Sequence, residues 1–288
     1  MFRRISVIGG DLRQLTLARM LICDGYDVLI YGFTRGIIAD GIPQTTDLKE
    51  ALGCDIVILP VPVSFDNKHI NAPFSDRELS IDEVIENINP LSIIFGGRIS
   101  EQISEQLTVR GVKHRDYMTR DELAIRNAVP TSEGAIQIAI SETPITLHGS
   151  KCLVLGYGKV GKILSHSLKG LGAKAYVGAR KYADLALIEG HGCIPLTINE
   201  AKTRIDEFDI IFNTVPALLL TKTVLERVRK DTLIIDLASK PGGVDFESAA
   251  ELELRVIWAL SLPGRVAPVT AGIIIKDTIT NMLSEMEV

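Results

Sequence analysis

The sequence predicts an α/β protein with two doubly wound domains, each built on a parallel sheet. Short apolar runs typical of strands alternate with amphipathic helix patterns through the first half of the chain, and the alternation starts again near residue 152. Aromatic residues make up only 5% of the chain, whereas aliphatic residues are abundant, as in buried parallel strands. A length of 288 residues is sufficient for two domains.

The first half is expected to open on a strand and to alternate from there. The strands are expected at residues 5–8, 27–30, 56–59, 92–95 and 112–114, and the helices at 12–23, 81–87 and 101–107. Residues 119–142 form one long helical pattern. Its interior Pro130 predicts a kink or a break, because proline has no amide hydrogen to donate.

The second half repeats the alternation and ends in a helix. Its strands are expected near residues 152–156, 174–178, 193–195, 209–213, 232–236 and 255–258. From Pro268 to the end of the chain, apolar residues recur at helical spacing.

A G-x-G-x-x-G motif follows the first strand of the second half and opens an amphipathic helix. Gly156 allows a tight turn, Gly158 lets a pyrophosphate approach the backbone, and Gly161 lets the helix pack closely. Free N–H groups at the helix N-terminus face the phosphates. A purely structural turn is the alternative, but the flanking strands and helix favour a dinucleotide site. The residues expected to contact the cofactor here are Gly156, Tyr157, Gly158, Lys159, Val160 and Gly161.

The end of the next strand favours NADP over NAD. NAD enzymes place a carboxylate about 20 residues after the glycines, on the adenosine ribose. This chain has Ala179, Arg180 and Lys181 there, and an arginine can hold a 2′-phosphate with two hydrogen bonds. A solvated basic turn is the alternative. We therefore expect an NADP site.

A second group of cofactor contacts is expected at the end of the fourth strand of this half. The segment Asn213, Thr214, Val215 and Pro216 combines polar residues with a proline. Such a turn can wall the nicotinamide ring and offer an amide to it. The alternative is a capped turn between a strand and a helix.

The first half begins with an incomplete copy of the glycine motif. Gly9 matches the first glycine, but Asp11 stands where the second is expected and Gln14 where the third is expected. A carboxylate at this place repels a pyrophosphate, whereas Asp11 suits the N-cap of the following helix. The first domain is therefore expected to be Rossmann-like without a dinucleotide, and to be free to hold the substrate.

Composition excludes several other classes of protein. The net charge of −5 and the absence of a basic cluster exclude a nucleic-acid-binding footprint. No apolar run approaches the ~20 residues of a membrane span, so a soluble, cytoplasmic protein is expected. The four cysteines show no C-x-x-C spacing and are expected to be buried, reduced thiols, and no metal site is expected.

Substrate groups are expected at the carboxyl ends of the strands, where doubly wound sheets bind ligands. Ser239 and Lys240 follow a strand and are able to bind a carboxylate, with a solvated turn as the alternative. Thr131 and Ser132 follow Pro130, where their hydroxyls either bind an acidic ligand or cap a new helical segment. Among the histidines, His69 and His114 are placed nearest a cleft.

Four further segments carry a resemblance to a known family, and the last three of them are much more specific than the glycine motif. They are residues 7–13, 130–135, 236–243 and 262–272, which read VIGGDLR, PTSEGA, DLASKPGG and LPGRVAPVTAG. With them the chain resembles the dipicolinate synthase A-subunit family over essentially its whole length. The broader architecture is similar to that of D-2-hydroxyacid dehydrogenases, although their Arg–Glu–His catalytic set has no match here.

This resemblance implies a domain organisation. Two Rossmann-like domains face a cleft, and a C-terminal helix returns to the first domain. The substrate domain comprises residues 1–130 with 268–288. The NADP-binding domain comprises residues 131–267, of which 131–150 form the linking helix.

The resemblance also implies a reaction and a partner. The expected reaction is oxidation of a dihydrodipicolinate-type intermediate to dipicolinate with NADP⁺, in the mother cell of a sporulating bacterium. The flavoprotein-like B-subunit of dipicolinate synthase is the expected partner, and a homodimer remains open. The residues expected to bind the two carboxylates are Thr131, Ser132, Ser239 and Lys240, with Arg98 and Arg265 behind them. The candidate proton acceptors are His114, Asp116 and Glu133.

Two alternatives stay open at this stage. One is another NADP-dependent oxidoreductase that acts on a small hydroxy or imino acid. The other is an NADP-binding scaffold or regulatory subunit whose partner carries out the redox step, because no acid–base residue stands out in the sequence.

Overall fold

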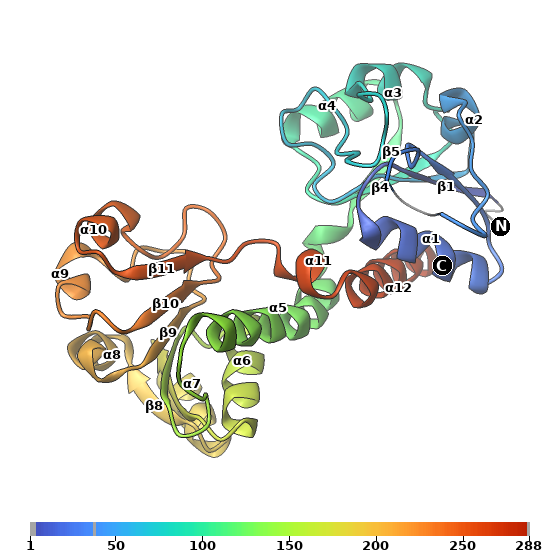
Figure 1. Ribbon diagram of the computed structural model, residues 1–288. Helices are drawn as coiled ribbons and strands as arrows, with labels where there is room; N and C mark the ends of the chain where they lie inside the picture. Colours follow the sequence, from blue (N-terminus) through green and yellow to red (C-terminus); the bar gives the residue numbers. More distant parts are fainter. Residues whose placement is uncertain (1–3, 37–38, 287–288) are drawn as a thin grey trace. The chain divides into compact units, whose positions relative to one another are not determined.

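A computed structural model of the chain describes residues 4–36 and 39–286. The chain divides into two compact units, each built around one parallel sheet (Figure 1). Unit 1 combines the chain up to Ala124 with the segment from Ala267 onward, and unit 2 covers Ile125–Val266. The chain therefore passes from unit 1 into unit 2 and returns to unit 1 for its last segment.

The boundary between the units lies inside helix α5, Asp121–Glu142. The domain organisation that the resemblance implies has this boundary at residue 130, and the chain re-enters the first domain at residue 268. Helix α5 is a single helix that includes Pro130, so the break expected at this residue is absent. The division is therefore not marked by any interruption of the helical pattern, and only the packing on either side of α5 reveals it.

Unit 1 contains a five-stranded parallel sheet in the order β2-β1-β3-β4-β5. Its elements are β1 (Arg4–Ile8), α1 (Leu12–Cys23), β2 (Asp27–Tyr31), α2 (Leu48–Leu52), β3 (Ile56–Ile58), α3 (Ile81–Asn87), β4 (Ile93–Gly96), α4 (Glu101–Val109), β5 (Lys113–Asp116), the 3₁₀ turn η1 (Tyr117–Thr119) and α12 (Pro268–Met286). The order reverses between β1 and β3, which makes their carboxyl ends the expected ligand site of this sheet.

Unit 2 contains a six-stranded parallel sheet in the order β11-β10-β9-β6-β7-β8. Besides most of α5, its elements are β6 (Lys151–Leu155), α6 (Lys159–Gly170), β7 (Lys174–Ala179), α7 (Tyr182–Gly190), β8 (Ile194–Thr197), α8 (Ile198–Thr203), η2 (Ile205–Glu207), β9 (Ile210–Asn213), α9 (Lys222–Leu225), β10 (Leu233–Asp236), α10 (Phe246–Glu251), β11 (Arg255–Trp258) and α11 (Leu262–Val266). This is the strand order of a dinucleotide-binding domain, with the reversal between β6 and β9.

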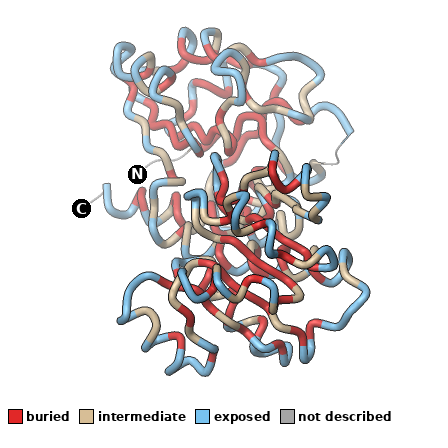
Figure 2. Tube along the Cα trace, turned by 90° about the vertical axis from the view of Figure 1, so that its left-hand side faces the viewer, coloured by how far each residue is buried: buried red, intermediate tan, exposed pale blue. Residues whose placement is uncertain are grey.

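Buried residues follow the strands of both sheets (Figure 2). Along β6, Cys152 and Val154 belong to one core cluster and Leu153 and Leu155 to another. Successive side chains of a strand point to opposite faces, so this alternation shows that both faces of the sheet are covered. Each fully buried aliphatic side chain stabilises the fold by about 1.5–3 kcal/mol. Both units therefore have a core of their own.

The C-terminal helix α12 packs on α1 within unit 1 (Figure 1), as the resemblance implied. The contact is close, because a Cβ on Gly272 would stand 2.5 Å from the carbonyl oxygen of Arg13. Two ion pairs fasten the helix, Lys276 to Asp24 at 2.8 Å and Arg120 to Glu285 at 2.6 Å. The last segment of the chain thus completes the first domain.

Three further findings concern membrane-spanning helices, groups of metal-binding residues and the cysteines. None of the helices in the described ranges is long and apolar enough to span a membrane. Within the same ranges, no group of three or more His, Cys, Asp or Glu residues is placed to hold a metal ion. Three cysteines are buried and free, but Cys23 is exposed at the end of α1, contrary to the expectation that all four are buried.

Candidate functional site

The G-x-G-x-x-G motif forms the turn between β6 and α6. Gly156 has a φ of 99°, and its N–H donates to the carbonyl oxygen of Gly178 on β7 at 2.9 Å. A Cβ on Gly156 would stand 2.5 Å from Thr214 Oγ1 and 2.7 Å from Val215 Cγ2. The first position of the motif therefore needs glycine for its backbone conformation and for space.

The other two glycines of the motif differ in what surrounds them. A Cβ on Gly161 would stand 2.1 Å from the carbonyl oxygen of Gly156, so α6 lies directly against the turn. A Cβ on Gly158 would meet no atom within 4 Å, and Gly158 lines the pocket outside the turn. One glycine serves packing and the other leaves the backbone open to a ligand, as a pyrophosphate site requires.

Two of the helices whose N-terminal ends lie at the pocket outside this turn, α6 and α7, have no side-chain cap. Gly158 precedes α6 and Lys181 precedes α7, and neither residue supplies an acceptor to the first-turn N–H groups. In the same unit, α8 and α10 are capped by Thr197 and Asp245. Uncapped N–H groups and the positive end of the helix dipole favour a bound anion at both places.

The pocket has a volume of about 590 Å³, within the usual range for small-ligand sites. Arg180 and Lys181 are exposed at its edge, just after β7. Neither forms an ion pair with a carboxylate in the described part of the chain. The lining residues are Gly156, Tyr157, Gly158, Lys159, Val160, Gly178, Ala179, Arg180, Lys181, Asp184, Ile198, Thr214, Val215, Pro216, Ala217 and Leu219.

The structure thus brings together most of the cofactor contacts expected from the sequence and adds several others. Gly161 and Asn213 do not line the pocket, whereas Asp184, Ile198 and Leu219 do. Asp184 is half-buried in the first turn of α7. Sequence spacing is the signal that could have identified Asp184. Residues three or four positions apart at the start of a helix are neighbours in space, and Asp184 is four positions after Arg180.

Asn213 has a role different from the one expected. It is buried, and its Nδ2 donates to Asp236 Oδ1 at 2.8 Å and to the carbonyl oxygen of Val215 at 3.0 Å. Its Oδ1 accepts from the N–H of Val215 at 3.2 Å. The amide expected to face the nicotinamide is therefore already used, and it holds the turn whose next residues line the pocket.

Asp236 is the buried partner that organises this edge of the sheet. Besides Asn213, its carboxylate accepts from the N–H of Ala238 at 3.0 Å and from the N–H of Gly243 at 2.8 Å. A Cβ on Gly243 would stand 2.2 Å from Asn213 Nδ2. The carboxylate therefore joins the loops that follow β9 and β10, and the sequence analysis did not identify this role.

The remaining cationic and hydroxyl candidates are accessible. Ser239, Lys240 and Arg265 are exposed on unit 2, and Arg98 is exposed on unit 1, where its φ is 55°. Glu133 is exposed on α5. None of these five residues lines the pocket outside the glycine turn.

Thr131 and Ser132 do not cap a new helix, and both hydroxyls form hydrogen bonds within α5. The Thr131 hydroxyl donates to the carbonyl oxygen of Asn127 at 2.7 Å, and the Ser132 hydroxyl donates to that of Ala128 at 2.7 Å. Ser132 is also fully buried. Because α5 continues through Pro130, both hydroxyls satisfy the backbone one turn earlier in the same helix.

His114 and Asp116 are likewise engaged in local contacts. Nε2 of His114 is bonded to Ser104 Oγ at 2.7 Å, and Nδ1 to the carbonyl oxygen of Val112 at 3.1 Å. Asp116 accepts from the backbone N–H groups of Arg98, Ile99 and Met118 at 2.7–3.1 Å. These contacts fix the loops at the end of β4 and β5.

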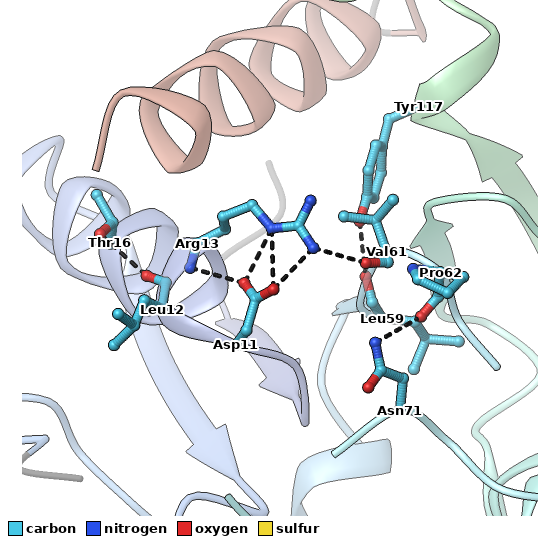
Figure 3. Close-up of polar contacts among 9 residues, drawn as sticks. All are labelled: Asp11, Leu12, Arg13, Thr16, Leu59, Val61, Pro62, Asn71 and Tyr117. Carbon is cyan, nitrogen blue, oxygen red and sulfur yellow. Dashed lines mark hydrogen bonds and ion pairs between the residues drawn. The ribbon is translucent and has the colours of Figure 1, made fainter. Parts of the chain in front are cut away.

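The incomplete glycine motif of unit 1 is closed by its own chain. The N–H of Gly10 donates to the carbonyl oxygen of Asn71 at 2.8 Å, and a Cβ on Gly9 would stand 2.9 Å from Ala72 Cβ. Asp11 caps α1 as expected, accepting from the N–H of Arg13 at 3.0 Å (Figure 3). A loop segment and a carboxylate thus stand where a pyrophosphate would need to bind.

A second pocket of unit 1, of about 470 Å³, lies beside this loop. Its walls include His69 and Asp66, whose Nδ1 and Oδ2 are 2.8 Å apart. This bond raises the pKa of His69 and, together with backbone N–H groups, lowers the pKa of Asp66. Both side chains are more than 40% exposed, so the pair contributes little to stability.

The fold and the glycine turn define a two-domain protein of the NAD(P)-dependent dehydrogenase class. A family profile described as the N-terminal domain of the dipicolinate synthase A-subunit matches residues 4–118. The dipicolinate synthase A-subunit of Bacillus subtilis (strain 168) is 35% identical over 294 residues, which cover 99% of this chain and 97% of that protein. The chain belongs to the dipicolinate synthase A-subunit family.

Solved structures agree with this assignment. The A chain of dipicolinate synthase from Bacillus subtilis superposes with a TM-score of 0.88 at 34% identity, covering 100% of this chain and 97% of that one. The A-subunit from Bacillus halodurans gives 0.89 at 33% identity, with 98% and 97% covered. A transhydrogenase from Sinorhizobium meliloti gives 0.73 at 16% identity, with 98% and 94% covered, which shows a shared fold. The family and the fold support an oxidoreductase role and a nucleotide cofactor.

Proposed function

We propose that this chain oxidises a dihydrodipicolinate-type intermediate to dipicolinate and binds NADP⁺ at the glycine turn of unit 2. The observation that carries the cofactor assignment is the pocket lined by Gly158, Arg180 and Lys181, onto which two uncapped helices open. The name of the Bacillus subtilis relative supplies the reaction product. The proposed setting is the mother cell of a sporulating bacterium.

The chain's own groups divide the cofactor between the two helix ends. The N-terminus of α6, behind Gly158, offers backbone N–H groups to the pyrophosphate. Arg180 and Lys181, with the N-terminus of α7, offer charge and N–H groups to the 2′-phosphate. The turn after Asn213 walls the far side of the pocket. NADP⁺ held at this pocket would supply the acceptor for the hydride that the dihydro ring loses on oxidation.

The half-buried Asp184 favours a second candidate, a site for NAD. A carboxylate near the adenosine ribose binds its hydroxyls and repels a 2′-phosphate. Asp184 lines the same pocket as Arg180 and Lys181. We favour NADP because the two cations directly follow β7, whereas Asp184 lies further along α7.

The cofactor proposal is tested by comparing both nucleotides on Arg180→Ala. Loss of a charged contact should weaken NADP(H) by about 1–3 kcal/mol and leave NAD(H) almost unchanged. Calorimetric titration of both nucleotides measures the difference, with Arg227→Ala, an exposed arginine outside the pocket, as the matched control. Equal losses for the two nucleotides would mean that Arg180 does not contact a 2′-phosphate.

The substrate proposal concerns a dianion that loses one hydride and one proton as its ring becomes aromatic. Lys240 and Arg265 are exposed cations of unit 2 that suit its carboxylates. The candidate proton acceptors remain Glu133, which is exposed on α5, and His114 and Asp116, whose side chains already bond neighbouring groups. The B-subunit of dipicolinate synthase is proposed as partner, since the name of the relative implies a second kind of subunit.

Turnover of the purified chain tests the reaction. The cyclic intermediate, generated in situ from pyruvate and aspartate semialdehyde by its synthase, is mixed with NADP⁺ and this chain, with and without the B-subunit. Dipicolinate and NADPH formed together by this chain alone support the proposal. Product formed only with both chains assigns the reaction to a shared or partner-borne site. Absence of product in both mixtures contradicts it.

A further inference from the structure

Arg13 is held in one orientation by two partners on unit 1. Its Nε donates to Asp11 Oδ1 at 2.9 Å and is 3.1 Å from Oδ2. Its Nη2 donates to Asp11 Oδ2 at 2.7 Å and to the carbonyl oxygen of Val61 at 2.8 Å (Figure 3). The side chain is only 15% exposed. The guanidinium therefore has little freedom to rotate.

These contacts use only one edge of the guanidinium. A guanidinium carries five N–H groups in a fixed fork, and the bonds to Asp11 and Val61 use those on Nε and Nη2. Nη1 forms no hydrogen bond within residues 4–36 and 39–286, and no dashed line reaches it in Figure 3. An arginine fixed along one edge is preorganised to bind an anion with the other, because its rotamer is already ordered.

The position of Arg13 is the one at which this sheet is expected to bind a ligand. Asp11 follows β1, and Val61 follows β3. The strand order reverses between these two strands, and doubly wound sheets bind ligands outside the carboxyl ends at that point. Arg13 spans the two chain segments there, through the bonds to Asp11 and Val61 (Figure 3).

The residue after Arg13 has a buried amide without a hydrogen-bond partner in the described residues. Gln14 is fully buried, and neither its Nε2 nor its Oε1 forms a hydrogen bond within the described residues. The amide lies against the turn, since a Cβ on Gly10 would stand 2.7 Å from Gln14 Cδ. Burial raises the pKa of Tyr117, and the Gln14 amide is close enough to the Tyr117 hydroxyl to oppose this rise, but no hydrogen bond of ordinary geometry joins the two side chains. Buried amides without partners are rare in proteins.

The Asp11 carboxylate binds more than the Arg13 guanidinium. The Asp11 carboxylate also accepts from a backbone N–H in the first turn of α1, where the helix dipole stabilises negative charge. The carboxylate is thus shared between the helix end and the guanidinium. In unit 1 the helix N-terminus is occupied by Asp11, and the group left to attract an anion is the open edge of Arg13.

We propose that Arg13 binds a carboxylate group of the substrate through Nη1, with Asp11 and Val61 as positioning groups. The ligand class is a small carboxylate, and the identity of the dicarboxylate rests on the proposed function. Unit 1 then contributes the substrate-binding cation that its incomplete glycine motif does not use for a nucleotide.

Direct binding of two probes tests this proposal on the full-length chain. Dipicolinate is titrated calorimetrically with and without NADP⁺, and its uncharged diamide, pyridine-2,6-dicarboxamide, is titrated in parallel. Arg13→Gln removes the charge, Arg13→Lys keeps the charge without the fork, and Arg110→Gln is the matched control on an exposed arginine at the C-cap of α4. Thermal unfolding and NADPH binding check that each variant is folded.

The expected result is that wild type binds dipicolinate and not the diamide. Arg13→Gln should weaken dipicolinate by about tenfold or more, Arg13→Lys by less, and Arg110→Gln should have no effect. Unchanged affinity of a folded Arg13→Gln variant, or no binding by wild type, overturns the proposal. Turnover separates it from the proposed reaction: wild-type turnover that Arg13→Gln retains contradicts the site alone, whereas Arg13-dependent binding without turnover contradicts the reaction alone.

Discussion

The two glycine turns of this protein have nearly the same backbone but opposite surroundings. Asp11 and Gly158 occupy the same position, the N-cap of the helix that follows the first strand of each unit, with ψ of −162° and −161°. In unit 2 the turn is open, and a Cβ on Gly158 would meet nothing within 4 Å. In unit 1 the turn is covered by the chain around Ala72, and a carboxylate caps the helix.

The third position of the motif shows how the space is redistributed. In unit 2, Gly161 is forced by the carbonyl oxygen of Gly156. In unit 1, the larger Gln14 fits because Gly10, which precedes Asp11, has no side chain. A Cβ on Gly10 would stand 2.7 Å from Gln14 Cδ, and the φ of Gly10 is 96°. The comparison teaches that the same turn can leave backbone N–H groups free for an anion, as in unit 2. It can instead be filled by side chains, of which Asp11 orients the Arg13 guanidinium, as in unit 1.

The largest effect is expected from Gly161→Ala. Its Cβ would stand 2.1 Å from the Gly156 carbonyl oxygen, a backbone atom that cannot move without opening the turn. We expect a loss of about 3 kcal/mol or more in the free energy of unfolding, together with loss of NADPH binding. Chemical denaturation and fluorescence titration measure the two quantities.

Gly158→Val is the matched variant in the same turn. Its side chain would enter open space, so the fold should remain intact while the nucleotide is excluded. The pair therefore separates packing from ligand access. If Gly158→Val keeps the wild-type affinity, the pyrophosphate does not bind at this turn.

A smaller effect is expected at the carboxylates that tie strand ends together in the two units. Asp236 is fully buried and accepts from Asn213, Ala238 and Gly243, so Asp236→Asn places a donor against other donors. We expect a loss of about 2–3 kcal/mol. Asp116→Asn, at the half-buried counterpart in unit 1, should cost less. Thermal unfolding of both variants measures the difference, and equal losses would contradict the role of burial.

The elements of this fold could be predicted closely because their signals are local. The helix at 12–23 agrees with its predicted bounds because Asp11 caps its start, and Ser80 does the same for 81–87. The turn at the three motif glycines is also local, although the space at Gly156 is limited by Thr214 and Val215, which lie far along the chain. The strand order of each sheet needed the structure, because pairing is set by packing across the chain.

The candidate site was predicted less well, for a physical reason. A residue type shows which hydrogen bonds a side chain can make, but not whether they are already made. Asn213, Ser132 and His114 all have suitable chemistry, and each uses it on the adjacent backbone or a neighbouring side chain. Arg13 was overlooked for the converse reason, because its partner Val61 lies 48 positions away.

The smallest effect on stability, and the sharpest on the comparison, is expected from Asp11→Asn. Asparagine caps a helix about as well as aspartate, and the ion pair lost is only partly buried, so the free energy of unfolding should fall by about 1 kcal/mol or less. Arg13, however, loses the charge that orders it. Dipicolinate affinity should therefore fall while NADPH affinity in unit 2 stays constant, as measured by parallel calorimetric titrations. A variant that loses stability but not dipicolinate affinity would show that Asp11 serves α1 alone and does not position Arg13.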